Sequence, residues 1–358
     1  MRSSVPLSHK NMGLMNSKRY LSALKKVDCE GLAGKTVVIT GGTGMIGSCL
    51  VDALAVFNRS QSDPCHIVVT SRRAEAAQKR FSYCWEQPWF TYIQQDVCDE
   101  AVNWPGQVDY VIHAASNADP LNFAKAPVDT LMANVLGTDR LLKAGMERGM
   151  KRFAYVSSGE MYGQPDADQN DFVEGYCGPI DHSSPRACYP AGKRSAEVLC
   201  QCYRAQYGAD CVIVRPCHTF GPTMAGGDSR AVSEFLRNAA AGKNIGMKSA
   251  GLVERSHCYV VDAADAIVRV LLHGESGGAY NIADPACKMT IRDFAFACAE
   301  AGGTQVVFEN PSDLELKGYS AISRQVLSAD KLRSLGWTGQ KQGSDAIRET
   351  VAILKEIR

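Results

Sequence analysis

The chain has 358 residues, of which 45% are hydrophobic and 22% are charged. That length can bury a sizeable core, as one large domain or as two lobes. The formal net charge of +1 gives no basis for a nucleic-acid or membrane-binding surface, and no apolar run approaches the roughly 18 residues of a membrane helix.

Residues 1–33 contain several basic side chains but no apolar segment like that of a secretory signal. We interpret them as an N-terminal extension, with a helix over 17–26. The fourteen cysteines form no CxxC pair, and many lie in apolar segments, which favours free thiols in a reducing cytoplasm. The cysteine and histidine spacing also predicts no metal site.

The first strong motif is the segment 36–47, TVVITGGTGMIG. Its β-branched run leads into Gly41, Gly44 and Gly47, where a strand must turn sharply into a helix and approach a pyrophosphate closely. Free N–H groups at the start of that helix would face the phosphates. A plain glycine turn is the alternative, but the amphipathic stretch 45–57 that follows favours a dinucleotide-binding loop.

Further along the chain, strand and helix patterns alternate. Strands fit 36–40, 66–70, 89–94, 108–113, 152–157 and 211–215, and helices fit 45–57, 127–149 and 189–207. This alternation predicts an α/β fold with a Rossmann-type doubly wound parallel sheet. We assign 34–216 to a dinucleotide-binding domain and 217–358 mainly to a smaller substrate-binding portion, with later segments returning to the first domain.

Tyr189 and Lys193 are four residues apart, so they share one helix face. A lysine and a positive nicotinamide beside the phenol would lower its pKa from about 10. Such a tyrosine can exchange a proton with a sugar hydroxyl while hydride moves. The pattern alone is common on surface helices, and its position after a dinucleotide loop and a strand ending at Ser158 makes it informative.

Six more motifs occur along the chain in this order: QDV at 95–97, HAAS at 113–116, NVLGT at 134–138, SGEMYG at 158–163, RPCHTFGP at 215–222 and RSHCYVVD at 255–262. With these motifs, residues 34–337 resemble the extended short-chain dehydrogenase/reductases, the NAD-dependent sugar-nucleotide epimerase/dehydratase family. The resemblance implies that Ser158 holds the reacting sugar oxygen. It also implies a set of further cofactor contacts: Met45, Ile46, Asp96, Val97, Ala114, Ala115 and Asn134.

Cofactor choice depends on the end of the second strand, which reads VTSRR at 69–73. An acidic residue there would bind the ribose hydroxyl of NAD, whereas Ser71 and Arg72 suit a 2′-phosphate. We therefore favour NADP slightly over NAD. In the alternative, Arg72 and Arg73 stack on adenine or lie in solvent while NAD binds.

Within the family, segments 113–120, 185–197 and 228–235 most resemble the UDP-glucuronate decarboxylase branch. The resemblance implies a UDP-linked sugar oxidised at C4 by a bound cofactor that is not consumed, followed by loss of carbon dioxide. Tyr189 would be the base and Glu160 would assist at C5 and C6. Arg255 would lie near the carboxylate or diphosphate, and Arg230 is either a phosphate contact or a helix-start arginine.

Several departures from the family pattern keep alternatives open. Gly159-Glu160 replaces the Asp-Glu pair of 4,6-dehydratases, which argues against that reaction, and decarboxylases often carry Ser in place of Gly159. Segment 189–193 reads YPAGK where decarboxylases usually have YDEGK. His218 replaces an Asn expected near the substrate phosphates. A UDP-sugar 4-epimerase and an NADPH-dependent carbonyl reductase remain alternatives, and a non-enzymatic sensor is disfavoured by the intact Tyr189 and Lys193.

The family commonly dimerises through two helices that form a four-helix bundle. Residues 128–146 and 191–207 would supply them here, so we expect a homodimer. The same apolar spacing is also what core packing requires.

Overall fold

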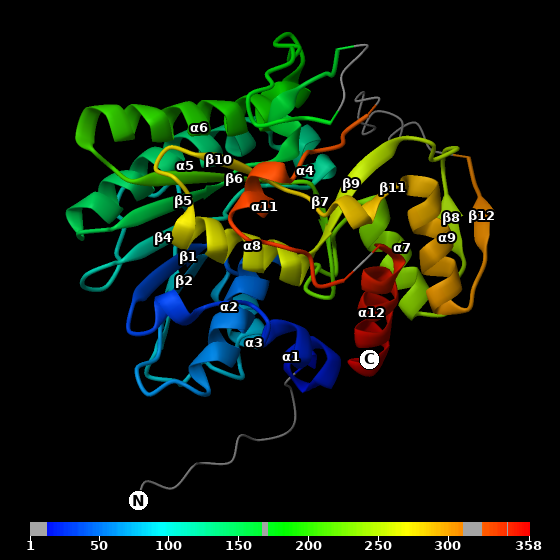
Figure 1. Ribbon diagram of the computed structural model, residues 1–358, viewed down its shortest axis with the longest axis horizontal. Coiled ribbons are helices and arrows are strands. Elements are labelled where there is room, and N and C mark those ends of the chain that lie inside the picture. Colours follow the sequence, from blue (N-terminus) through cyan, green and yellow to red (C-terminus); the bar gives the residue numbers. More distant parts are fainter. Residues whose placement is uncertain (1–12, 167–170, 311–323, 342) are drawn as a thin grey trace, which may run out of the picture.

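The computed structural model describes residues 13–166, 171–310, 324–341 and 343–358 (Figure 1). Its central layer is a sheet of seven parallel strands in the order β10-β6-β5-β4-β1-β2-β3. The strands are β1 Thr36–Thr40, β2 His66–Ser71, β3 Phe90–Gln94, β4 Tyr110–His113, β5 Arg152–Val156, β6 Cys211–Pro216 and β10 Ala279–Ile282. This sheet confirms the predicted doubly wound α/β fold.

Helices cover both faces of the sheet. They are α2 Met45–Asn58, α3 Ala74–Arg80, α4 Pro120–Lys125, α5 Pro127–Glu147, α6 Cys188–Tyr207 and α8 Val260–His273. Helices α5 and α6 pack side by side on one face, and α2 and α8 pack together on the other. The predicted helices 45–57, 127–149 and 189–207 are confirmed to within two residues at each end, whereas α3, α4 and α8 were not predicted.

A second region lies beyond the carboxyl ends of the strands (Figure 1). It contains two small sheets, with orders β11-β9-β7 and β12-β8, and three helices that pack on one another. Its elements are β7 His218–Phe220, α7 Ala231–Ala240, β8 Ile245–Met247, β9 Glu254–Tyr259, β11 Lys288–Thr290, α9 Ile291–Gly302, β12 Val306–Phe308 and α12 Gly343–Glu356. Between β9 and β11 the chain returns to the large sheet through α8 and β10, and α11 Asp330–Ser334 packs near β10.

From residue 13 onward the N-terminal segment is part of the folded core. Its elements are the 3-10 helices Gly13–Asn16 and Glu30–Leu32 and helix α1 Lys18–Leu24, which forms within the predicted 17–26 stretch. Tyr20 is fully buried and its hydroxyl donates to Asp52 of α2 at 2.8 Å. The predicted N-terminal extension, 1–33, is therefore wrong for residues 13–33. Residues 1–12 lie outside the described ranges.

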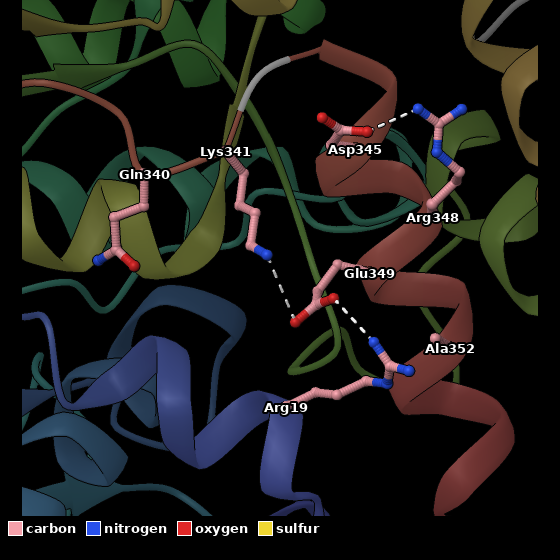
Figure 2. Close-up of a pocket in the computed structure, with 7 residues that line it drawn as sticks. All are labelled: Arg19, Gln340, Lys341, Asp345, Arg348, Glu349 and Ala352. Carbon is pink, nitrogen blue, oxygen red and sulfur yellow. Dashed lines mark hydrogen bonds and ion pairs between the residues drawn. The ribbon is translucent and has the colours of Figure 1, made fainter.

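The first and last helices also border a polar groove of about 610 Å³, shown in Figure 2. Glu349 of α12 lies 3.6 Å from Arg19 of α1 and 3.7 Å from Lys341, and Arg348 lies 2.6 Å from Asp345. The Arg19–Glu349 pair connects the two ends of the described chain, and the other two pairs lie within its C-terminal segment. Within the described ranges, no helix has the length and apolar character needed to cross a membrane.

Candidate active site

The connection from β1 into α2 requires glycine at two positions, 41 and 47. Gly41 has a φ of +65°, and a Cβ there would lie 2.6 Å from Ala115 Cα. A Cβ on Gly47 would lie 2.4 Å from the carbonyl oxygen of Gly41. Gly44 is the N-cap of α2 and offers no side-chain cap, so the first N–H groups of the helix are available to a ligand anion.

This turn opens into a cavity of about 1010 Å³ at the carboxyl ends of the central strands. Such a position, where the strand order reverses, is where doubly wound sheets bind ligands. The predicted site residues that line it are Gly41, Gly44, Met45, Ile46, Gly47, Ser71, Arg72, Asp96, Val97, Ala114, Ala115, Ser158, Glu160, Tyr189, Lys193, His218 and Arg230. Asn134 and Arg255 are not among the lining residues.

Asn134 is buried beneath the cavity wall, so the expected direct contact with a cofactor must be corrected. Its side chain is fully buried, and its Oδ1 accepts hydrogen bonds from Ser116 Oγ at 3.2 Å and Tyr155 Oη at 3.0 Å. Its Nδ2 donates to the carbonyl of Thr130 at 2.8 Å. Ser116 does line the cavity, so Asn134 contributes to the site by holding the side chain of Ser116.

Tyr189 and Lys193 face the cavity from the start of α6. Lys193 Nζ donates to the carbonyl of Val156 at 2.8 Å. Burial lowers the pKa of Lys193 to about 7, opposed by the charge of Glu197. The ring of Tyr189 stacks on Phe123 of α4, with centroids 4.6 Å apart.

The expected lowering of the Tyr189 pKa is not found in this structure. Burial raises the pKa of Tyr189 to about 12, the negative charge of Glu160 adds to this, and a hydrogen bond with Ser158 opposes it. Lys193 directs its ammonium to a backbone carbonyl. The protein alone therefore holds the phenol in its neutral form.

Glu160 lines the cavity together with Ser158 and Tyr189, and an arginine holds it in an ion pair. Arg186 Nη2 donates to Glu160 Oε2 at 2.8 Å. Burial lowers the pKa of Arg255, and the negative charge of Glu160 opposes this shift. Arg255 is 7% exposed, and its Nη1 donates to Oε1 of Gln325, which does line the cavity.

Arg230 also lines the cavity, close to the start of α2. It forms a two-point ion pair with Asp228, with Nη2 2.5 Å and Nε 3.0 Å from the carboxylate oxygens. The same Nη2 lies 3.9 Å from the sulfur of Met45.

His218 also lines the cavity. Burial and the charge of Arg255 lower the pKa of His218 well below its usual value, so its imidazole is neutral.

At the opposite end of the cavity, β2 finishes without an acidic residue. The hydroxyl of Ser71 lies 3.2 Å from Tyr92 Oη and is therefore already engaged. Arg72 lines the cavity, with its guanidinium 3.9 Å from Asp96 and 3.5 Å from the amide oxygen of Asn117. Its side chain is 65% exposed.

Residues 37–283 match the model of the NAD dependent epimerase/dehydratase family. The chain belongs to this family. UDP-glucuronic acid decarboxylase 6 of Arabidopsis thaliana is 32% identical over 272 residues, which cover 76% of this chain and 73% of that protein. UDP-glucuronic acid decarboxylase 1 of Xenopus tropicalis is 31% identical over 251 residues, covering 70% of this chain and 56% of that protein.

Solved structures agree on the fold of this family member. The dTDP-glucose 4,6-dehydratase DesIV of Streptomyces venezuelae, solved with NAD bound, superposes with a TM-score of 0.76 at 24% identity, covering 90% of this chain and 97% of that one. The UDP-glucose 4-epimerase of Thermotoga maritima, solved with UDP-glucose, gives a TM-score of 0.74 at 21% identity, covering 90% and 99%.

Three residues at the site were not predicted from the sequence. Arg186 lies inside the quoted segment 185–197, and its charge beside a catalytic candidate could have suggested a role. Phe123 and Gln325 carry no motif. Only the folded chain brings them to Tyr189 and Arg255.

Proposed function

We propose that this protein is a nucleotide-sugar enzyme that oxidises its substrate at C4 and removes carbon dioxide, as a UDP-glucuronate decarboxylase would. The observation that carries this proposal is the part of the cavity where Glu160, held by Arg186, lies with Ser158 and Tyr189; we call it the sugar end. Arg186 is bound to that carboxylate, and Arg255 contacts Gln325 of the same cavity lining, so two guanidinium groups belong to this region. Guanidinium groups suit a carboxylate ligand, and the names of the relatives agree with an acidic sugar.

The site residues fit a nicotinamide dinucleotide. The glycine turn leaves no room for a Cβ and presents helix N–H groups, so Gly41, Gly44 and Gly47 would hold the pyrophosphate. Val97 and Ala115 would line the adenine and nicotinamide portions. When bound, the cofactor supplies hydride acceptance at C4 and later hydride return.

The protein's own groups would move protons and hold the sugar. Ser158 would donate to the C4 oxygen, and Tyr189 would take its proton. A ketone at C4 lies β to the C6 carboxylate, so the electrons of the C5–C6 bond can pass into an enolate as carbon dioxide leaves. The enolate then takes up a proton at C5, and Glu160, held in place by Arg186, would assist this proton transfer. A cation at the nicotinamide would add to Lys193 in favouring the phenolate, against the burial that raises the pKa of Tyr189.

Mass spectrometry of nucleotide sugars tests this proposal. Purified protein with catalytic NAD or NADP should convert UDP-glucuronate into a product lighter by one carbon dioxide. A new isomer of unchanged mass would instead indicate a 4-epimerase. No change in any sugar of the panel, with consumption of NADPH on small carbonyls, would indicate a reductase.

The preference for NADP rests on Arg72. Its exposed guanidinium has only long contacts with Asp96 and Asn117, so it could turn to a 2′-phosphate. We expect NADPH to bind more tightly than NADH, and Arg72→Ala to remove the difference. Equal affinities in the unchanged protein would leave NAD as the cofactor.

A homodimer is proposed on the outer face of α5 and α6. Exposed apolar side chains on these helices are Val128 and Leu131 of α5 with Val198 and Tyr207 of α6. Packing two copies through this face would remove them from water. Light scattering at micromolar concentration should give twice the chain mass, and a monomeric mass would contradict the dimer.

All fourteen cysteines are free in the structure, which supports a reducing compartment such as the cytoplasm.

A further inference from the structure

Gln325 places a buried amide at the sugar end of the cavity. The residue is 3% exposed and lines the cavity. Its main chain pairs with β9 at Arg255: Gln325 N–H donates to the carbonyl of Glu254 at 3.3 Å, and Ser256 N–H donates to the carbonyl of Gln325 at 3.0 Å. These bonds do not involve the side chain, so they should survive its replacement.

The orientation of this amide follows from its neighbour. Arg255 can only donate hydrogen bonds, and its Nη1 lies 3.1 Å from Oε1 of Gln325. The oxygen of the amide must therefore face Arg255, and the Nε2 hydrogens point elsewhere.

The other end of the amide is beside Gly159. Nε2 of Gln325 lies 3.4 Å from the point where a Cβ on Gly159 would sit. Gly159 directly precedes Glu160, the carboxylate at the sugar end. Leu327 Cδ1 lies 3.0 Å from the same point, so the position has no room for a side chain, and Gly159 and the amide of Gln325 lie together in the cavity lining. The amide contributes a hydrogen-bond donor to this part of the cavity.

We propose that Gln325 is a specificity residue that binds the carboxylate at C6 of the sugar through Nε2. Arg255 holds the amide in the required orientation and contributes positive charge. This inference rests on the proposed function in taking a nucleotide sugar with an acidic C6 as the ligand. A neutral amide can donate to that carboxylate without forming an ion pair with Glu160.

Calorimetric binding of two ligands tests the role of Gln325. UDP-glucuronate and UDP-glucose differ at C6, and Tyr189→Phe protein with saturating cofactor prevents turnover during the titration. In that background Gln325→Met should weaken UDP-glucuronate by about tenfold to a hundredfold, as expected for a lost hydrogen bond to a charged group. UDP-glucose should change by less than about threefold, because its hydroxyl carries no charge.

Two further variants complete the experiment. Gln325→Glu keeps the shape of the side chain and places a negative charge beside the ligand carboxylate, so it should weaken UDP-glucuronate more than Gln325→Met does. Gln201→Met is the matched control, because Gln201 lies on the exposed side of α6 and bonds only to Gly277 among the described contacts.

Equal weakening of both sugars, or of neither, would overturn the assignment of Gln325. This outcome is separate from failure of the proposed function. If no carbon dioxide is released but UDP-glucuronate binds, the affinity ratio still decides the role of Gln325. If UDP-glucuronate does not bind while Gln325 is intact, both proposals are wrong.

Discussion

The glycine turn and the sugar end of the cavity are organised differently. Gly41, Gly44 and Gly47 lie on one continuous segment, from the turn into the first turn of α2, and backbone atoms leave no room for a side chain at Gly41 and Gly47. Around Glu160, by contrast, the charged and polar groups come from separate elements, and each is held by a side-chain contact. On the proposed assignment of the site, cofactor binding would depend on local backbone shape, whereas substrate choice would depend on how distant segments meet.

The largest expected effect comes from removing the proposed proton-transfer group, the hydroxyl of Tyr189. This change should leave both the glycine turn and the sugar end intact. Tyr189→Phe keeps the ring that stacks on Phe123 and removes only the hydroxyl. We expect kcat to fall by about a thousandfold, while calorimetric affinity for the dinucleotide stays unchanged. Tyr207→Phe, on the exposed end of the same helix, is the control. A kcat within severalfold of the unchanged enzyme would exclude Tyr189 as the base.

Glu160→Gln tests the sugar end. The substitution removes the charge that binds Arg186 but preserves the shape of the side chain. Release of carbon dioxide should slow by about a hundredfold, while oxidation at C4, followed by stopped-flow absorbance of reduced nicotinamide, should slow much less. Glu234→Gln, exposed on α7, should change neither rate. If both rates fall equally, Glu160 is a structural carboxylate.

Gly41→Ala tests the glycine turn. The added methyl group would meet the backbone of Ala115 at 2.6 Å and would sit at a φ of +65°. Dinucleotide affinity should weaken by roughly tenfold to fiftyfold, since overpacking typically costs one to three kcal/mol. Gly106→Ala is a close control, because Gly106 also has a positive φ but no atom within 4 Å of its would-be Cβ. Similar losses in the two variants would mean that backbone strain, and not crowding, explains the glycine.

The same contrast explains how far the sequence could be interpreted. Spacing within one element determines geometry, so the glycine turn and the Tyr189–Lys193 helix face could be predicted. A residue type does not reveal its neighbours, and so Asn134 was expected at the cofactor although its amide is used by Ser116 and Tyr155. The raised pKa of Tyr189 depends on burial, which no motif reports.

Long-range contacts were the least predictable part of the site. Gln325 meets Arg255 across a separation of 70 residues. Nothing in the local sequence of either one indicates the other. The charge around Glu160 likewise depends on Arg186, which is 26 residues away. Pairings of this kind are set by the fold as a whole, and a single sequence without its structure cannot supply them.

The smallest expected effect concerns Asp262, in the first turn of α8. Burial raises the pKa of Asp262 to about 7, and the charge of Asp284 adds to this, while the bond from Gln340 N–H to Oδ1 opposes it. Between about pH 4 and about pH 7 the folded protein therefore holds a proton that the unfolded chain has released, so stability falls as pH rises through this window.

Asp262→Asn has no proton to lose and keeps an oxygen that can accept from Gln340. Its Tm should exceed that of the unchanged protein by a few degrees at about pH 8, where the penalty is complete, and by less at about pH 5. Thermal unfolding of both proteins at the two pH values measures the difference, with Asp330→Asn on exposed α11 as the control. A Tm gap that does not widen with pH would show that Asp262 is ionised in the fold, and that the contacts between α8 and the C-terminal segment stabilise its charge.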